Sequence, residues 1–246
     1  GSLPTILPAL LLQNGMSYYR NDLSATVFST REGVEVFDAF ASLYTDYSCL
    51  VYFDALNRFR TGEMPLLIGP FSTYNSLYIQ APEIKGQWVM LPIPGTPREE
   101  DGRTVVDISE EDTGTAAILL RDSDKRDSAW RFIRWWSSDE IQSAFAANLE
   151  TLLGPAARYS TANRNAFASL AWSRQERERL ERQRDSVKEM PEIPASYILS
   201  RNLANAFLDV VKDGRNARET IGTYAVIMDN ELERKQKELD ARKARS

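Results

Sequence analysis

The stretch FRTGEMPLLIGPFSTYN, Phe59 to Asn75, joins a charged turn, a short apolar run and then Gly69-Pro70-Phe71. A continuous apolar run of this length predicts a buried strand over residues 64–68, with Pro65 at its start or near a sheet edge. The Gly-Pro pair then breaks the strand and leaves an aromatic ring directly after the break. The position of that ring raises the question whether it faces a bound ligand.

Short strands and amphipathic helices alternate along the chain, and this order predicts an α/β fold. Further strands are expected at GQWVMLPIPG (86–95) and GTAAILL (114–120), and REEDGR (98–103) is expected to be a polar loop. Ser29 and Glu32 have the spacing of a capping box, and Ser138 is expected to cap the second of two adjoining helices. The helices are expected over residues 29–47, 54–60, 123–147 divided near 137–140, 172–189, 196–211 and 217–237.

Composition excludes several classes of function. The 246 residues carry a net charge of -5 with a pI near 5.1, which disfavours a nucleic-acid partner because phosphate binding needs a concentrated basic face. The sequence contains no run of about 18 apolar residues that could cross a membrane. It also lacks Met at its start, so we expect the chain to be part of a longer protein.

The sequence contains no histidine and a single cysteine, Cys49. Metal sites built from Cys and His are therefore excluded, as are Ser-His and Cys-His nucleophile pairs. We expect no metal and no cofactor. The acidic pairs Glu99-Glu100 and Glu110-Glu111 are interpreted as solvated loop charge, because adjacent acids point to different sides of a strand or helix.

The order of the motifs resembles the second half of the extracellular solute-binding proteins of carbohydrate ABC transporters, the group that contains maltose-binding protein. The resemblance runs from about Leu10 to the C-terminus and is closest to the large lipoprotein-type members of Gram-positive bacteria. The motifs that carry it are FRTGEMPLLIGPF, GQWVMLPIPGT, TGTAAILL with SAWRFIRWWSSDEIQSAF, LLGPAARYSTAN and MPEIPASYILSRNLANAF.

The resemblance implies a type II periplasmic-binding-protein-like fold, present here as the C-terminal lobe with part of the N-terminal lobe. Residues 3–102 and 166–239 would form the C-terminal lobe. Residues 103–165 would cross into an N-terminal lobe that is incomplete in this chain. The predicted strand at 114–120 would then lack partners, which favours local disorder, rearrangement or self-association. We expect the chain to bind sugar weakly or not at all.

The resemblance also implies an answer for the ring after the Gly-Pro break. In the family, this segment lies at the rim of the cleft between two lobes, and its aromatic ring stacks on a sugar. Phe71 has that position here, and Tyr74 and Asn75 can hydrogen-bond the polar edge of the sugar. The alternative is that Phe71 is an ordinary core residue.

Three further ligand-binding residues follow from the resemblance: Thr113, Tyr197 and Arg201. Tyr197 and Arg201 are expected at a helix start that lines the cleft, where Arg201 could pair with a uronate or, alternatively, form a surface ion pair. Thr113 begins the strand that returns toward the first lobe, and tight packing would explain it equally well. The cluster Trp130, Trp135 and Trp136 is interpreted as core.

The implied function is capture of a sugar or oligosaccharide between two lobes and its delivery to the permease of an ABC transporter, without catalysis. The protein would be extracellular and held at the cell membrane through an upstream lipid anchor. Two alternatives remain open. One is an interaction or sensor module that uses the charged helix at 172–189, and the other is a polysaccharide-degrading enzyme that acts through two carboxylates.

Overall fold

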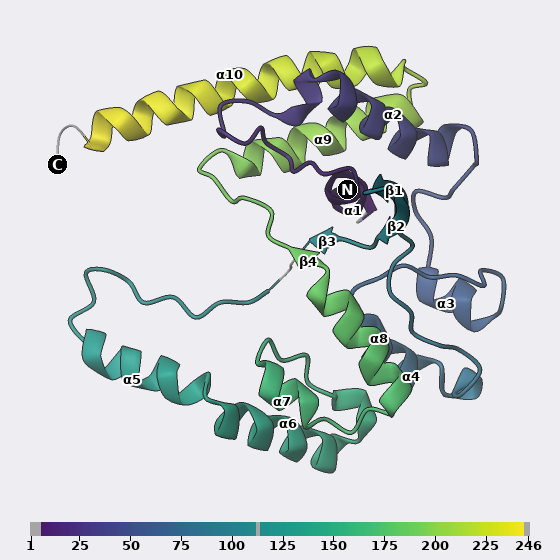
Figure 1. Cartoon of the computed structure of the whole chain (residues 1–246), viewed down its shortest axis with the longest axis vertical. Coiled ribbons are helices and arrows are strands. Elements are labelled where there is room, and N and C mark those ends of the chain that lie inside the picture. The colour runs from purple at the N-terminus through teal and green to yellow at the C-terminus, as the bar shows by residue number, and fades with distance from the viewer. Residues whose placement is uncertain (1–5, 112–113, 244–246) are drawn as a thin grey trace. The chain divides into compact units, whose positions relative to one another are not determined.

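The computed structural model describes residues 6–111 and 114–243, which divide into two compact units (Figure 1). Unit 1 comprises Gly1–Phe53, Ile93–Asp112 and Asp185–Ser246, and unit 2 comprises Asp54–Pro92 and Thr113–Arg184. The lobe boundaries expected from the sequence lie near residues 102 and 165. The chain changes units at other positions. The assignment of these segments to two lobes stays a prediction.

Unit 1 is built around three long helices that contact one another, α2 (Arg31–Thr45), α9 (Ser196–Val211) and α10 (Ala217–Lys243). All three were expected from the sequence. A shorter helix α1 (Ile6–Gln13) and a 3-10 turn η1 (Val27–Ser29) complete this part. The predicted cap of α2 was wrong by one residue, because the hydroxyl of Thr30 accepts the hydrogen bond from the Gly33 amide at 3.1 Å.

The core of unit 1 lies where these helices meet and is rich in aromatic rings. Phe40 packs against Phe207 with ring centroids 5.2 Å apart, and Tyr44 packs edge-on against Phe207 at 4.8 Å. Removing such rings from water is the main stabilising term for the unit. The fully buried large side chains of this core include Leu7, Leu11, Phe28, Phe37, Phe40, Leu203 and Ile221.

Both sheets of the described residues belong to unit 1, and each has two strands. β1 (Thr96–Glu100) pairs antiparallel with β2 (Arg103–Asp107), and β3 (Glu110–Glu111) pairs parallel with β4 (Val187–Lys188). The hairpin corrects the expectation of a polar loop at 98–103. Asp101 and Gly102 both have positive φ, 50° and 73°, and so form the tight turn that joins antiparallel strands.

A buried glutamine ties the hairpin to α1. The Gln13 amide donates to the carbonyls of Pro94 at 3.1 Å and Ser109 at 3.3 Å, and it accepts from the Thr96 hydroxyl at 2.8 Å. These bonds satisfy a polar side chain that is almost fully removed from water.

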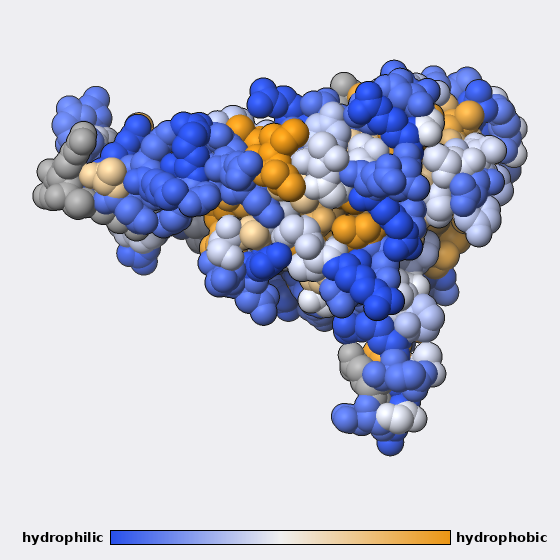
Figure 2. All heavy atoms as spheres, turned by 90° about the horizontal axis from the view of Figure 1, so that it is seen from above, coloured by the Kyte–Doolittle hydropathy of each residue, from blue (hydrophilic) through white to orange (hydrophobic). Residues whose placement is uncertain are grey.

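The far half of α10 is a charged surface helix. Lys235 pairs with Glu238 at 3.0 Å and Lys237 with Glu233 at 2.5 Å, at the spacing of neighbours on one helix face. Figure 2 shows the corresponding end of the molecule as mostly hydrophilic, with the hydrophobic patches of this view gathered farther along.

Unit 2 consists of helices and irregular segments in its described residues. Its longer helices are α4 (Ser72–Gln80), α5 (Arg126–Trp136), α6 (Asp139–Leu153) and α8 (Arg174–Asp185). Shorter ones are α3 (Ala55–Arg60), α7 (Arg164–Ala168), η2 (Pro82–Ile84) and η3 (Pro155–Ala157). The helices predicted at 54–60 and 123–147 are confirmed, and the one predicted at 172–189 is confirmed as far as Asp185, beyond which Val187–Lys188 form β4 instead. Helix α4 was not predicted.

The division of the predicted helix pair at 137–140 is also confirmed. Ser138 stands at the N-cap position of α6, but its hydroxyl donates to the Trp135 carbonyl at 2.7 Å and does not cap the helix.

The three strands predicted for 64–68, 86–95 and 114–120 were wrong, since none of these segments is a strand. Leu66, Ile118 and Leu120 are 84%, 80% and 72% exposed. The described part of unit 2 contains no strand that could pair with them, and an apolar run without a partner has nothing to satisfy its backbone groups as a strand.

The interpretation of the α5 tryptophans as core was wrong for two of three. Trp130 and Trp135 are 53% and 52% exposed, and only Trp136 packs inward, edge-on to Phe145 with ring centroids 5.0 Å apart.

In the part of the chain that the structure describes, no helix has both the length and the apolar character needed to cross a membrane.

Candidate functional site

A cluster of aromatic side chains forms the centre of unit 2. Tyr74 and Trp172 are about 95% buried and meet edge-on, with ring centroids 4.9 Å apart. Trp88 contacts Tyr74 edge-on at 5.6 Å, and Phe71 contacts Trp172 at 5.7 Å. The cluster therefore joins α4, the segment that follows η2, and the start of α8.

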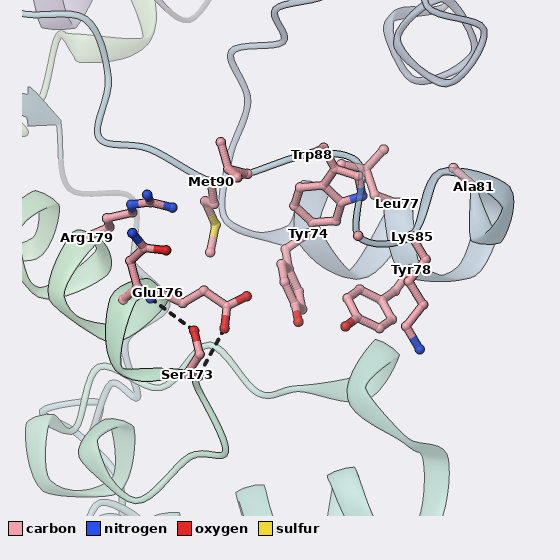
Figure 3. Close-up of a pocket in the computed structure, with 13 residues that line it drawn as sticks. Tyr74, Leu77, Tyr78, Ala81, Lys85, Trp88, Met90, Ser173, Glu176 and Arg179 are labelled. Carbon is pink, nitrogen blue, oxygen red and sulfur yellow. Dashed lines mark hydrogen bonds between the residues drawn. The ribbon is translucent and has the colours of Figure 1, made fainter.

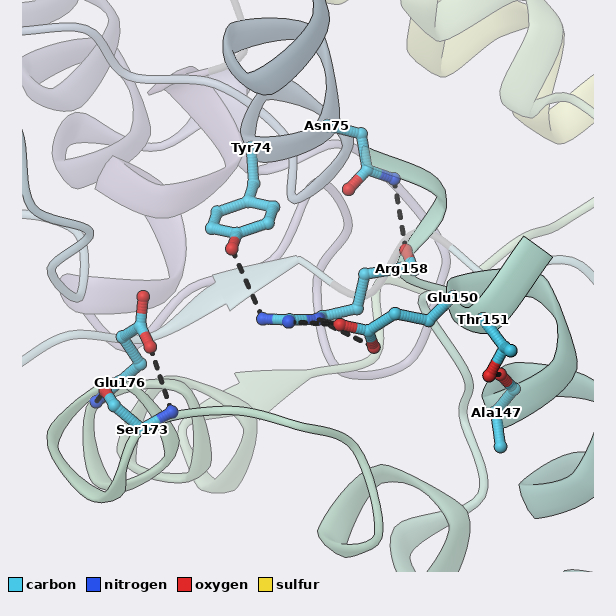
Figure 4. A network of polar contacts seen from close by, with 8 residues as sticks. All are labelled: Tyr74, Asn75, Ala147, Glu150, Thr151, Arg158, Ser173 and Glu176. Carbon is cyan, nitrogen blue, oxygen red and sulfur yellow. Dashed lines mark hydrogen bonds and ion pairs between the residues drawn. The ribbon is translucent and has the colours of Figure 1, made fainter. Parts of the chain in front are cut away.

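A buried arginine lies beneath this cluster (Figure 4). Arg158 follows η3, and its Nε donates to both carboxylate oxygens of Glu150 at 3.1 Å. Its Nη1 donates to the Tyr74 hydroxyl at 3.2 Å, and its carbonyl accepts from the Asn75 amide at 3.1 Å. The guanidinium also lies over the Trp172 ring, 4.2 Å from the centroid.

Burial and the contacts in this network shift the pKa values of two groups. Burial raises the pKa of the Tyr74 phenol, and the neighbouring Tyr78 hydroxyl adds to that shift. Burial opposes the charge of Arg158, but the hydrogen bonds that Arg158 donates to Glu150, together with the charges of Glu150, Glu176 and the Tyr74 oxygen, raise the arginine pKa overall. Both groups therefore keep their protons at neutral pH, and Arg158 donates to Glu150 and to the Tyr74 hydroxyl.

A pocket opens beside the cluster (Figure 3). It has a volume of about 250 Å³ and lies wholly within unit 2. One wall carries the rings of Tyr74, Tyr78 and Trp88, which come from α4 and the segment after it. The facing wall comes from the first turns of α8. The remaining lining residues are Leu77, Ala81, Lys85, Gly86, Val89, Met90, Ser173, Gln175, Glu176 and Arg179.

The lining combines flat apolar faces with hydrogen-bonding groups. Glu176 supplies an acceptor, Arg179 supplies donors, and Gln175 supplies both. The Lys85 ammonium lies 5.3 Å from the centroid of the Tyr78 ring. Such a site suits a small molecule with one apolar face and a polar edge. Among the described residues, no group of three or more Cys, Asp or Glu side chains is arranged to hold a metal ion.

The structure places Phe71 and Tyr74, two of the predicted ligand-binding residues, in or beside this site. Tyr74 lines the pocket, and Phe71 is half-buried at the start of α4 against Trp172. Asn75 is near both, but its amide nitrogen is bonded to Arg158 and its Oδ1 is buried with no partner among the described residues. Their role in binding a ligand stays a prediction.

The other predicted ligand-binding residues lie elsewhere. Tyr197 and Arg201 are exposed on the first turns of α9, in unit 1, so the predicted helix start is confirmed. Thr113 lies outside the described residues.

The sequence reasoning missed Tyr78, Trp88 and Glu176. Tyr78 follows Tyr74 at the i+4 spacing that puts both rings on one helix face, so a search for helical spacing would have found it. Ser173 and Glu176 have the spacing of a capping box, which marks the start of α8. For Trp88 only the tertiary arrangement shows that it lines the pocket.

The pair Glu110-Glu111 does not consist of solvated loop charge, contrary to expectation. Both side chains are half-buried, and burial raises the pKa of each carboxyl, with charge repulsion from Glu110 and Glu192 adding to the shift at Glu111.

No protein-family profile and no curated protein matches the sequence of this chain. Solved structures do match. The sugar-binding protein MalE of the phytopathogen Xanthomonas citri is 16% identical, with a TM-score of 0.69 over 96% of this chain and 57% of that one. An ABC transporter solute-binding protein of Thermotoga lettingae, bound to α-D-tagatose, is 13% identical, with a TM-score of 0.65 over 93% and 56%.

A third similar structure is an ABC substrate-binding protein of Listeria monocytogenes in complex with cycloalternan. It is 16% identical, with a TM-score of 0.60 over 94% of this chain and 58% of that one. The chain thus spans a little over half the length of each of these proteins. The expected type II periplasmic-binding-protein-like α/β fold is confirmed by these likenesses.

Proposed function

We propose that this chain binds a sugar in the aromatic pocket of unit 2. The observation that carries the proposal is the facing arrangement of Trp88, Tyr74 and Tyr78 against the polar side chains of α8. A sugar ring has an apolar face of C-H groups that matches a flat aromatic surface, and hydroxyl groups at its edge that need hydrogen-bonding partners.

The fold supports this proposal independently. Proteins of similar structure are named for binding sugars or were solved with tagatose or cycloalternan. Fold alone does not determine function, so the pocket chemistry is the stronger support. The two point to the same ligand class.

In the whole protein, the pocket would be one part of a larger trap. We propose that two lobes close on the sugar and that the closed form is presented to the permease of an ABC transporter. Phe71, Tyr74, Asn75, Thr113, Tyr197 and Arg201 remain the residues proposed to contact the sugar in that closed form. We further propose an extracellular location in a Gram-positive cell, with a lipid anchor upstream.

The experiment is a calorimetric titration of the 246-residue chain with neutral hexoses and with tagatose and maltose. We expect dissociation constants on the order of 1 mM, since a pocket within one unit offers few contacts. Trp88→Ala should weaken binding about 10-fold or more, the factor for loss of a stacked ring. Trp130→Ala is the matched control, because Trp130 is exposed and does not line the pocket.

The proposal fails if none of these sugars binds, or if both tryptophan variants bind as tightly as the parent chain. Melting temperatures of both variants, measured in parallel, separate a loss of binding from a loss of folding.

A further inference from the structure

The N-terminus of α8 is closed by a reciprocal pair of side chains. The Glu176 Oε2 accepts from the Ser173 amide at 3.0 Å, and the Ser173 hydroxyl accepts from the Glu176 amide at 3.2 Å. Each bond satisfies a backbone donor that the first turn of a helix leaves open. The pair therefore fixes the Glu176 side chain in one orientation.

This arrangement uses only one of the two carboxylate oxygens. Among the residues that the structure describes, no hydrogen bond or ion pair engages the other oxygen of Glu176. In Figure 3 the carboxylate points from α8 toward Tyr74, across the pocket. The Glu176 charge also contributes to the raised pKa of Tyr74, after burial and the Tyr78 hydroxyl, which agrees with their proximity.

Glu176 is the one acidic side chain among the described residues that line the pocket. The other charged lining groups, Lys85 and Arg179, can only donate hydrogen bonds. Sugar hydroxyls are donors as well as acceptors, and a carboxylate is the strongest acceptor that a protein side chain can offer them. The free oxygen has the chemistry and the direction to receive a hydroxyl proton.

We propose that Glu176 is the specificity-determining residue of the pocket, and that it selects a ring bearing a hydroxyl group at the position facing α8. The inference rests on the proposed function, because it concerns the same pocket. The capping bonds hold the carboxylate in place before the ligand arrives, so little ordering is needed on binding. A sugar ring that lacks this hydroxyl displaces water from the free carboxylate oxygen of Glu176 without offering it a hydrogen bond. Such a ring therefore binds more weakly.

The experiment compares a sugar with its deoxy analogues. Glucose, galactose and mannose are titrated into the chain by calorimetry, and the tightest binder is then compared with its 2-, 3-, 4- and 6-deoxy forms. We expect one deoxy form to bind about 10-fold more weakly than the parent sugar, the factor for one hydrogen bond to a charged group in a half-open site.

Two variants separate recognition from helix capping. Glu176→Gln keeps an oxygen for the Ser173 amide but removes the charge. The gap in affinity, meaning the ratio of the dissociation constants of the deoxy and the parent sugar, should therefore shrink to about 2-fold or less. Ser173→Ala removes one capping bond and should lower the melting temperature. The gap should stay near 10-fold in Ser173→Ala, because Glu176 keeps its charge and its bond to the backbone amide.

The outcomes are distinct. A gap that persists unchanged in Glu176→Gln, or equal binding of all deoxy forms to the parent chain, overturns the role of Glu176 and leaves sugar binding intact. A chain that binds none of the three hexoses and neither tagatose nor maltose overturns both this inference and the proposed function.

Discussion

The guanidinium of Arg158 lies 4.2 Å from the centroid of the Trp172 ring, and the same arginine is paired with Glu150 through both carboxylate oxygens. The side chains of Arg158 and Glu150 are only 6% and 16% exposed. A buried charge of this kind is costly unless it is paired, and here the pair also supports the aromatic wall of the pocket.

Arg158→Met should therefore destabilise unit 2 by about 3 to 5 kcal/mol, because it leaves the Glu150 carboxylate buried without its partner. Urea unfolding followed by circular dichroism measures the change. Arg174→Met is the control, since Arg174 pairs with Glu178 on the surface with 93% exposure and should change stability by about 0 to 1 kcal/mol. Equal free energies of unfolding for the two variants would show that the buried pair does not stabilise unit 2.

Phe71→Ala tests the ring after the Gly-Pro break. If Phe71 stacks on the sugar as predicted, affinity should fall by about 1 to 3 kcal/mol in calorimetry. Phe71→Leu, which keeps apolar bulk against Trp172, should lose a similar share of affinity with little loss of melting temperature. Unchanged affinity together with a large drop in the melting temperature of Phe71→Ala assigns the ring to the core.

The half-buried acids Glu110 and Glu111 should make unit 1 less stable as the pH rises. Burial raises the pKa of both carboxyls above the value in the unfolded chain. A group of this kind contributes its stabilisation fully below the unfolded pKa, and the contribution is lost as the pH rises through the folded pKa. The contribution of these two carboxyls to the stability of the folded state should thus decline from about pH 4 toward neutrality.

Glu111→Gln removes one of these titrations and should raise the melting temperature at pH 7 by about 2 to 4 °C, with little effect at pH 4. Differential scanning calorimetry at the two pH values measures the difference. Glu189→Gln is the control, because Glu189 is exposed in the same unit. An increase in the melting temperature of Glu111→Gln that is the same at both pH values would mean that titration of Glu111 does not cause it.

Two glycines of unit 1 should respond to substitution in opposite ways. A Cβ at Gly33 would lie 2.1 Å from the Val27 carbonyl oxygen, whereas a Cβ at Gly222 would meet nothing within 4 Å. Gly33→Ala should therefore destabilise the unit by about 1 to 3 kcal/mol. Gly222→Ala, inside α10, should stabilise it by roughly 0.5 to 1 kcal/mol through helix propensity. Thermal unfolding measures both, and destabilisation by Gly222→Ala would refute the packing described for α10.

The helices could be predicted from the sequence because their signals are local. The apolar residues of α2 recur at helical spacing, and the charged residues of α8 begin directly after Ser173. The strands could not be predicted in this way, since a strand forms only with a partner. The apolar run at 64–68 has none, while the less apolar β1 and β2 pair through the Asp101-Gly102 turn.

The candidate site could be predicted only in part for a similar reason. Phe71 and Tyr74 follow a visible break in the chain and were found. The pocket also requires Trp88 and Glu176, which are 88 residues apart in the sequence, and no local pattern links them.

The distribution of tryptophan gives the protein an internal optical label. The sequence contains five tryptophans, and Trp88, Trp130, Trp135, Trp136 and Trp172 all belong to unit 2. Excitation at the red edge of the absorption band, where tyrosine does not absorb, therefore produces emission from unit 2 alone. Unit 1 contains tyrosine but no tryptophan and stays dark under that illumination, so the unfolding of unit 2 can be followed by itself in an unlabelled sample.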